Sequence, residues 1–181
     1  MKYIALLRGI NISGKNKIAM SDLTKELEKN NYQNVLTYLN SGNVIFESNI
    51  TDKLTIMRNI YQIIKEKFNL EIPVFVMTSS ELEEILNNQP SWWGSNNKEI
   101  YDNLIFIIPP TTYEEVYHSI GNPKEHIEQI KEYNNVIFWS FDLKNYRKSN
   151  WWVKTASTEI KDQITIRTSN TMKKVLELCH R

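Results

Sequence analysis

The chain has 181 residues, of which 41% are hydrophobic and 24% are charged, the composition of an ordinary globular protein and not of a disordered, collagenous or membrane protein. The longest apolar run, residues 104–108, is too short to cross a bilayer, and a single cysteine, Cys179, excludes an internal disulfide and a thiolate-rich metal site. We therefore expect a cytoplasmic protein with no secretory signal, no membrane partner, no metal and no cofactor.

The net charge of +1 hides a strong segregation along the chain. Residues 1–20 carry four basic side chains and no acid, and residues 144–181 carry nine basic side chains against three acids. Residues 79–143 between them carry three lysines against eleven acids. This asymmetry predicts a surface for an anionic partner, although solvated helix faces would give the same pattern.

The predicted elements of the first half are a strand, a helix, two strands, a helix and a strand. Residues 2–8 form a strand with two apolar faces, and the next helix has Ser21 or Asp22 as its N-cap. Strands at 35–39 and 44–46 flank a turn at 40–43, which indicates a hairpin. A second helix starts at Thr51, a strand at 72–77 ends the half, and the apolar stripe of that helix comprises Leu54, Met57, Tyr61, Ile64 and Phe68.

The same order recurs from about Asn103. A strand at 104–108 precedes a helix with a capping box of Thr112 and Glu115 and an end at Gly121. Residues 127–133 and 136–141 indicate a hairpin, although the first arm also fits a helical turn. The remaining elements are a helix over 144–158, a strand at 164–168 and a terminal helix with Met172, Val175, Leu176 and Cys179 on one face.

We predict an α+β fold of two consecutive ferredoxin-like (split βαβ) halves with mainly antiparallel sheets, plus a C-terminal helix. The predicted divisions are an N-terminal half at 1–78, a linker with a short helix at 79–102 and a C-terminal half at 103–181. In a ferredoxin-like sheet the first and second strands run parallel and end at the same edge. The loop 9–19 and the turn 40–43 should therefore meet.

The loop after the first strand has nearly the spacing of a phosphate-binding P-loop. Gly9, Gly14 and Lys15 fit the motif, but Asn16 stands where magnesium binding requires Ser or Thr, and the helix starts several residues too late. The two alternatives are a looser nest of backbone amides, helped by the basic residues of the loop, and a plain structural loop.

Two long motifs carry a family resemblance. Residues 6–11 read Leu-Leu-Arg-Gly-Ile-Asn and continue through Gly-Lys-Asn-Lys at 14–17, and residues 37–46 read Thr-Tyr-Leu-Asn-Ser-Gly-Asn-Val-Ile-Phe. Both resemble the signatures of the bacterial domain-of-unknown-function family number 1697. Residues 168–171 resemble the family's C-terminal motif but lack its Trp, and Ser13 replaces a usual second Gly. The resemblance implies a two-part α+β fold in small cytosolic bacterial proteins and supplies no activity.

Both motifs fall on the segments that the predicted topology brings together, which indicates a cluster of donors for an anion. This first cluster comprises Arg8, Asn11, Lys15, Lys17, Asn40, Ser41 and Asn43. The alternative is structural, because Asn residues also cap loops and form turns. A second basic cluster includes Arg167 and Asn170, where a strand leads into a helix N-terminus, a geometry that serves anion binding or ordinary capping.

Other chemistry receives little support from the sequence. The five Trp residues could stack on nucleic-acid bases, but the apolar strand faces indicate a covered sheet, so we expect the Trp side chains to fill an interface between the halves. The three His residues lack metal-ligand spacing, and Cys179 lies on an apolar helix face. No catalytic residue is predicted.

The leading hypothesis is a binding protein for a phosphate-bearing ligand, either a nucleotide or a nucleic acid, at the basic sheet edge. One alternative is an enzyme acting on a small anionic metabolite in a cleft between the halves, with Arg8, Lys15 and Arg167 as a clamp. Another alternative is an interaction protein without a small ligand. The sequence does not determine the oligomeric state.

Overall fold

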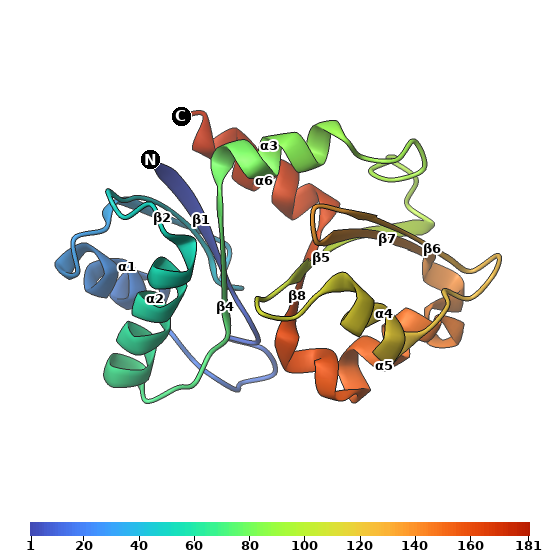
Figure 1. Ribbon diagram of the computed structural model, residues 1–181, viewed down its shortest axis with the longest axis horizontal. Helices are drawn as coiled ribbons and strands as arrows, with labels where there is room; N and C mark the ends of the chain where they lie inside the picture. Colours follow the sequence, from blue (N-terminus) through green and yellow to red (C-terminus); the bar gives the residue numbers. More distant parts are fainter. The chain divides into compact units, whose positions relative to one another are not determined.

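The computed structural model describes all residues from Met1 to Arg181 (Figure 1). The chain divides into two compact units, the first made of Met1–Glu83 with Val175–Arg181 and the second of Glu84–Lys174. Each unit holds one four-stranded antiparallel sheet and its own helices. The predicted α+β fold with two ferredoxin-like parts and a C-terminal helix is confirmed.

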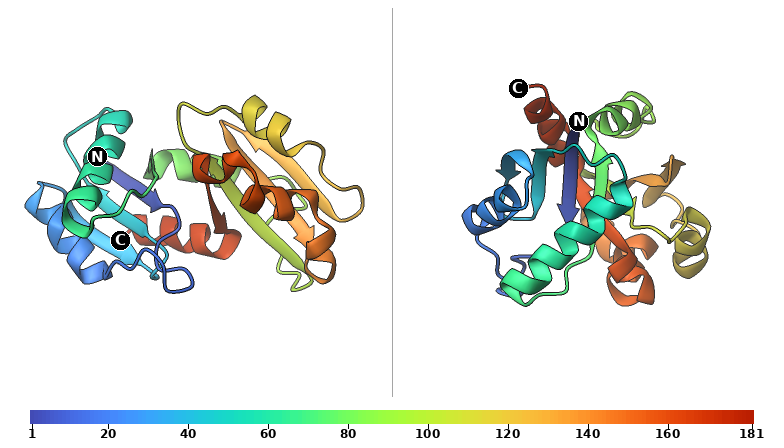
Figure 2. Two further views of the ribbon diagram at one scale, coloured as in Figure 1. Left: turned by 90° about the horizontal axis from the view of Figure 1, so that it is seen from below. Right: turned by 60° about the vertical axis from the view of Figure 1, so that its left-hand side comes forward.

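The sheet of unit 1 has the strand order β2-β3-β1-β4. Every neighbouring pair is antiparallel, and Ala5 of the central strand lies opposite Val44 on one side and Val76 on the other. Helices α1 and α2 pack on one face of this sheet (Figures 1 and 2). The elements are β1 (Lys2–Leu7), α1 (Met20–Lys29), β2 (Gln33–Tyr38), β3 (Asn43–Glu47), α2 (Lys53–Phe68) and β4 (Val74–Thr78).

Unit 2 repeats the topology, with the strand order β6-β7-β5-β8. The predicted capping box of Thr112 and Glu115 begins α4, and Gly121 ends it with a φ of 85°. Two 3-10 helices, η1 (Leu143–Lys148) and η2 (Glu159–Gln163), flank α5. The other elements are β5 (Ile100–Ile107), α4 (Tyr113–Ile120), β6 (Glu128–Tyr133), β7 (Val136–Asp142), α5 (Asn150–Ser157) and β8 (Ile164–Thr168).

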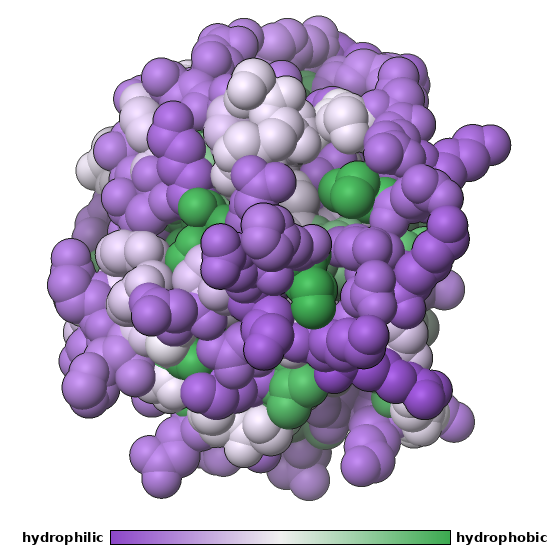
Figure 3. Space-filling model, turned by 90° about the vertical axis from the view of Figure 1, so that its right-hand side faces the viewer, coloured by the Kyte–Doolittle hydropathy of each residue, from purple (hydrophilic) through white to green (hydrophobic).

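The central strands are shielded from solvent on both faces. Residues 3–7 of β1 and 104–107 of β5 are fully buried, as their two-sided apolar patterns predicted. The expectation that the Trp residues fill an interface between the halves is wrong for Trp139 and Trp151, which lie in the core of unit 2 against Ile105 and Ile164. On the face seen in Figure 3, apolar residues form small groups separated by hydrophilic ones.

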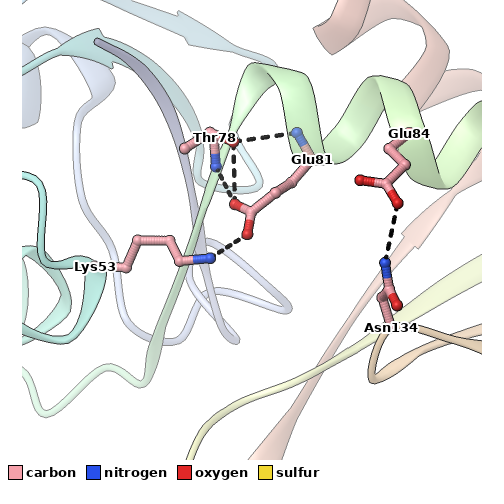
Figure 4. Close-up of polar contacts among 5 residues, drawn as sticks. All are labelled: Lys53, Thr78, Glu81, Glu84 and Asn134. Atoms are coloured by element: carbon pink, nitrogen blue, oxygen red, sulfur yellow. Dashed lines mark hydrogen bonds and ion pairs between the residues drawn. The ribbon is translucent and has the colours of Figure 1, made fainter.

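Helices α3 (Ser79–Asn87) and α6 (Ser169–Cys179) each carry one of the unit boundaries. At the start of α3, the Thr78 hydroxyl accepts a hydrogen bond from the Glu81 amide at 3.1 Å, and the Glu81 carboxylate accepts one from the Thr78 amide at 2.8 Å (Figure 4). Lys53 forms an ion pair with the same carboxylate. Within unit 2, Glu84 accepts a hydrogen bond from Asn134 in the β6–β7 turn (Figure 4).

Two sequence expectations about the helices of unit 1 are wrong in detail. Helix α1 begins at Met20, and its N-cap is Ala19 without a side-chain hydrogen bond, not Ser21 or Asp22. In α2, Leu54 is 51% exposed, and the buried face comprises Ile56, Met57, Ile60, Ile63 and Ile64. Because the helix contains many isoleucines, two overlapping sets of apolar residues both have helical spacing. Packing against the sheet determines which set is buried.

The single helix expected over 144–158 is divided at Ser149. This residue ends η1, and its side chain accepts a hydrogen bond from the Trp152 amide at 2.9 Å as the N-cap of α5. The hydroxyl therefore competes with continued helix for the backbone donors, which is the usual effect of serine at such a position.

Candidate functional site

The loop 9–19 and the β2–β3 turn meet at one edge of the unit 1 sheet. The Leu7 amide at the end of β1 donates to the Gly42 carbonyl at 2.8 Å, and the Asn11 side chain donates to the Asn40 carbonyl at 2.8 Å. The parallel direction of β1 and β2 places both C-terminal ends at this edge. The predicted meeting of the two motifs is confirmed.

Asn11 acts as a brace inside this edge. Its amide nitrogen donates to the carbonyls of Ile18 at 2.9 Å and Asn40 at 2.8 Å, and its oxygen accepts from the Ile18 amide at 2.9 Å. Asn43 is fully buried and donates to the Tyr38 carbonyl and to the Ser41 hydroxyl. These two asparagines shape the edge from within, which is the structural alternative that the sequence left open.

The loop itself is a small hairpin and not a P-loop. The Lys15 amide donates to the Ile12 carbonyl at 2.9 Å, and the Asn11 amide donates to the Asn16 carbonyl at 3.1 Å. Ser13 and Gly14 form the tip with positive φ angles of 50° and 77°, a conformation that explains why a glycine would suit position 13. Helix α1 starts only after this hairpin is closed, so its N-terminus does not follow the glycines directly.

Gly42 allows the turn to approach the first strand. Its φ is +78°, and an added Cβ would lie 2.6 Å from the Leu7 Cβ and 2.9 Å from the Ile10 Cδ1. Only glycine combines this backbone conformation with such a close approach. The glycine of the second motif therefore has a direct role in joining the two motifs.

A depression of about 460 Å³ lies where the loop, the turn and the start of α1 come together. We call it the loop seat, and its lining residues are Asn11, Gly14, Lys17, Ile18, Ala19, Met20 and Asn40. The lining holds one ammonium group and no carboxylate. The adjacent Lys15 is exposed, and neither Lys15 nor Lys17 takes part in an ion pair. The electrostatic character of the loop seat therefore favours an anion.

The remaining predicted residues are distributed over both units. Arg8 is half-buried at the end of β1, and its backbone amide donates to the Pro73 carbonyl at 3.0 Å. Arg167 is 9% exposed on β8 and donates to the Thr165 hydroxyl and the Ile166 carbonyl, each at 2.9 Å. Asn170 is exposed in the first turn of α6. Arg167 and Asn170 belong to unit 2 and the other seven residues to unit 1, so a clamp of Arg8, Lys15 and Arg167 stays a prediction.

Sequence reasoning missed a buried carboxylate, Glu128, at the start of β6. It is 5% exposed and accepts hydrogen bonds from the backbone amides of Lys124 at 2.8 Å and Asn150 at 2.7 Å. The Trp139 indole, the Ser149 hydroxyl and the Trp151 amide also donate to it. Five donors, two of them at the N-terminus of α5, compensate the burial of this charge. No sequence signal separates Glu128 from its exposed acidic neighbours.

Other candidate chemistry is limited. No group of three or more His, Cys, Asp or Glu side chains is placed to hold a metal ion, and no helix has both the length and the apolar character needed to cross a bilayer. Burial raises the pKa of the Cys179 thiol to about 11, although Lys2 opposes the shift. This thiol is therefore protonated, and its reactivity is suppressed, near neutral pH.

The fold and the edge geometry define a class of two-unit α+β proteins in which a glycine turn is braced against the loop after the first strand. The family model described as "Protein of unknown function (DUF1697)" matches residues 1–138, and the chain belongs to this family. Among solved structures, the chain is similar to the conserved bacterial protein SP0830 from Streptococcus pneumoniae, with a TM-score of 0.86 and 25% identity over 98% of each chain. A search of curated proteins found no match.

Proposed function

We propose that the protein binds a phosphate-bearing ligand, a nucleotide or a nucleic acid, at the loop seat. The observation that carries the proposal is the carboxylate-free lining around Lys17, beside a second unpaired lysine, Lys15. A volume of about 460 Å³ lies within the range of small-molecule sites, which is about 300–1,000 Å³. The loop seat is thus large enough for a nucleotide or for a few units of a polynucleotide.

The lining supports binding by charge and by backbone groups. Ala19, the N-cap of α1, provides no side-chain cap, and Ala19 and Met20 both line the depression. The first amides of a helix and an ammonium group attract the same anion, and their effects add. Met20 supplies partly exposed apolar surface next to these groups, which suits a ligand with a base or sugar beside its phosphate.

We further propose that the protein works in the cytoplasm, where nucleotides and nucleic acids are abundant. A single cysteine in 181 residues agrees with a reducing compartment. The proposal includes anion binding as the molecular activity and no membrane partner.

A charge-matched pair of variants tests the loop seat. Lys15→Gln with Lys17→Gln removes two charges at the loop seat, and Lys25→Gln with Lys98→Gln removes two charges from exposed lysines elsewhere. Each contact between ammonium and phosphate at an exposed site contributes roughly 0.7–1 kcal/mol. We expect the first variant to weaken binding of ATP, pyrophosphate and a short single-stranded oligonucleotide by roughly ten- to thirtyfold in calorimetric titrations.

The control variant should bind within about twofold of the unmodified protein, because its lysines lie outside the loop seat. Equal weakening by both variants would show that only the net charge matters. Failure of all three ligands to bind at low salt would remove the proposal.

A further inference from the structure

A second surface, in unit 2, combines an exposed indole and a half-buried tyrosine with basic groups. It lies on η1, α5 and the loop before β6, and we call it the basic aromatic surface; its residues are Lys124, Tyr146, Arg147, Lys148, Trp152 and Val153. Trp152 is 41% exposed and Val153 is 49% exposed. A single exposed apolar side chain is ordinary on a protein surface, and Trp152 is of interest because a cationic side chain and a second aromatic ring lie near it.

Trp152 is held in place by two aromatic neighbours. The indole makes T-shaped contacts with Phe141 at a centroid distance of 5.4 Å and an interplanar angle of 61°, and with Tyr146 at 5.1 Å and 81°. Phe141 is buried in the core, and the Trp152 backbone amide is capped by Ser149. Neither neighbour is stacked parallel to the indole, and the 41% of Trp152 that is exposed is the part that a further ring could contact.

Cationic groups line a hollow next to the first turn of α5. Lys124, Arg147 and Lys148 line a depression of about 500 Å³, together with Val153 and one carboxylate, Glu125. The carboxylate lies 3.5 Å from the His126 imidazole and forms no ion pair with these three cations. Lys124 and Lys148 have exposed side chains and no ion-pair partner. The hollow therefore carries a net positive charge.

Arg147 connects the cations with the aromatic rings. Its Nε donates to the Tyr146 hydroxyl at 2.9 Å, and its guanidinium carbon lies 5.5 Å from the centroid of the Tyr146 ring. Its terminal nitrogens are left to bind an anion bidentately, as guanidinium groups do with phosphates. Tyr146 thus contacts both Arg147 and Trp152 and links the cations to the exposed indole.

The backbone of α5 contributes structure to this surface and not binding groups. Its first amides, those of Asn150 and Trp151, donate to the buried Glu128 carboxylate. This internal anion occupies the place of an external one and fixes the start of the helix. Any ligand must therefore be recognised by the side chains of η1, α5 and the loop before β6.

We propose that the basic aromatic surface binds single-stranded nucleic acid, with phosphates at Lys124, Arg147 and Lys148 and a base stacked on Trp152. Proteins that bind single strands without sequence preference combine these two features. A membrane surface fits less well, because α5 has only eight residues, including Asn150, Lys154 and Ser157, and interfacial helices need a broad apolar face. The apolar groups seen in Figure 3 are small and separate.

The proposal is tested by fluorescence anisotropy with a labelled oligothymidylate of about twelve nucleotides over a range of salt concentrations. Trp152→Ala and Trp152→Leu should each weaken binding by at least about fivefold, whereas Trp152→Phe should retain most of the affinity, because stacking requires an aromatic face. Arg147→Gln with Lys148→Gln should lower the slope of log affinity against log salt by about 1.4, because two phosphate contacts are lost.

This experiment distinguishes failure of the loop-seat proposal from failure of the present inference. Loss of binding in the Lys15 and Lys17 variant, with no effect of the Trp152 or Arg147 and Lys148 variants, would overturn the present inference and leave the loop seat in place. The opposite pattern would support the basic aromatic surface and count against the loop seat. Far-ultraviolet circular dichroism and urea unfolding of each variant show whether the fold is retained.

Two further measurements, competition by polyglutamate and binding to anionic vesicles, test for other partners. An acidic polypeptide would be the partner if two results occurred together. Polyglutamate would compete as well as unlabelled oligonucleotide, and the Trp152→Leu variant would bind with the affinity of the unmodified protein. These results would overturn the inference. Binding to anionic vesicles with no binding to the oligonucleotide would overturn it in favour of a membrane surface. Weak competition by polyglutamate and retention by Trp152→Phe would support it.

Discussion

Replacing Gly42 with alanine should break the junction between the two family motifs. A left-handed backbone costs an L-residue about 1–2 kcal/mol, and the smaller conformational freedom of alanine in the unfolded chain returns about 0.4–1 kcal/mol. The new Cβ would also lie 2.6 Å from the Leu7 Cβ and 2.9 Å from Ile10, an overpacking that costs about 1–3 kcal/mol. We expect a net loss of about 2–4 kcal/mol in the unfolding free energy.

Gly9→Ala is the matched control. Gly9 has a φ of +66°, and an added Cβ there would meet nothing within 4 Å. The left-handed backbone conformation is then the only source of strain, so we expect the unfolding free energy to fall by about 1 kcal/mol. The difference between the two variants isolates the close approach of the turn to β1.

The assay is urea unfolding followed by two signals. All five Trp residues lie within unit 2, so Trp fluorescence reports unit 2 and far-ultraviolet circular dichroism reports both units. Gly42→Ala should shift the circular dichroism transition to lower urea concentration more than Gly9→Ala does. Equal losses of unfolding free energy in the two variants would refute the claim that the junction depends on the space at Gly42.

Three further predictions concern other buried or titrating groups. Glu128→Ala should lower the unfolding free energy by roughly 3 kcal/mol or more, measured by Trp fluorescence in urea, because five donors lose their acceptor; a loss below about 1 kcal/mol would contradict this account. Burial raises the pKa of Glu81, but Lys53 and Thr78 lower it more, so the net pKa lies below the ordinary value of 4.5. The Glu81 carboxylate therefore stabilises the fold above its unfolded pKa, and the advantage over Glu81→Gln should disappear as the pH falls from about 6 to about 3; a pH-independent difference in unfolding free energy would disprove it. Cys179, with a pKa of about 11, should react with an aromatic disulfide reagent far more slowly at about pH 8 than in urea; equal rates would show that the thiol is not protected.

The fold was predictable wherever a local pattern has one structural meaning. Thr112 and Glu115 satisfy each other's backbone donors at the start of α4, so this local pattern predicts the N-terminus of the helix. The meeting of the loop with the turn at 40–43 followed from strand direction alone. The meeting of these two segments was predictable because topology restricts which strand ends share an edge.

Other features depend on packing that the sequence leaves open. The isoleucines of α2 allow two overlapping faces, and only the sheet determines which one is buried. The division at Ser149 depends on a serine whose hydroxyl bonds to the Trp152 amide and to the buried Glu128. A residue-type pattern contains no information on that long-range acceptor, so the broken helix and its exposed Trp152 were missed.

The candidate site, too, was predictable in its topology and not in its side-chain contacts. The sequence identified which segments meet, but Asn11 and Asn43 use their amides on the protein itself. Lys15 and Lys17 remain as the exposed charges of the edge. Distinguishing a brace from a ligand contact requires the geometry, because asparagine serves both purposes equally well in a turn.

The claim that the loop seat holds phosphate is tested most directly by amide NMR spectra recorded during a titration with pyrophosphate. The account predicts shifts that saturate, concentrated at residues 14–20 and at Asn40, and their loss when Lys15 and Lys17 are both replaced by glutamine. Spectra that do not change at the loop seat, or changes that lie only in other segments, would contradict it.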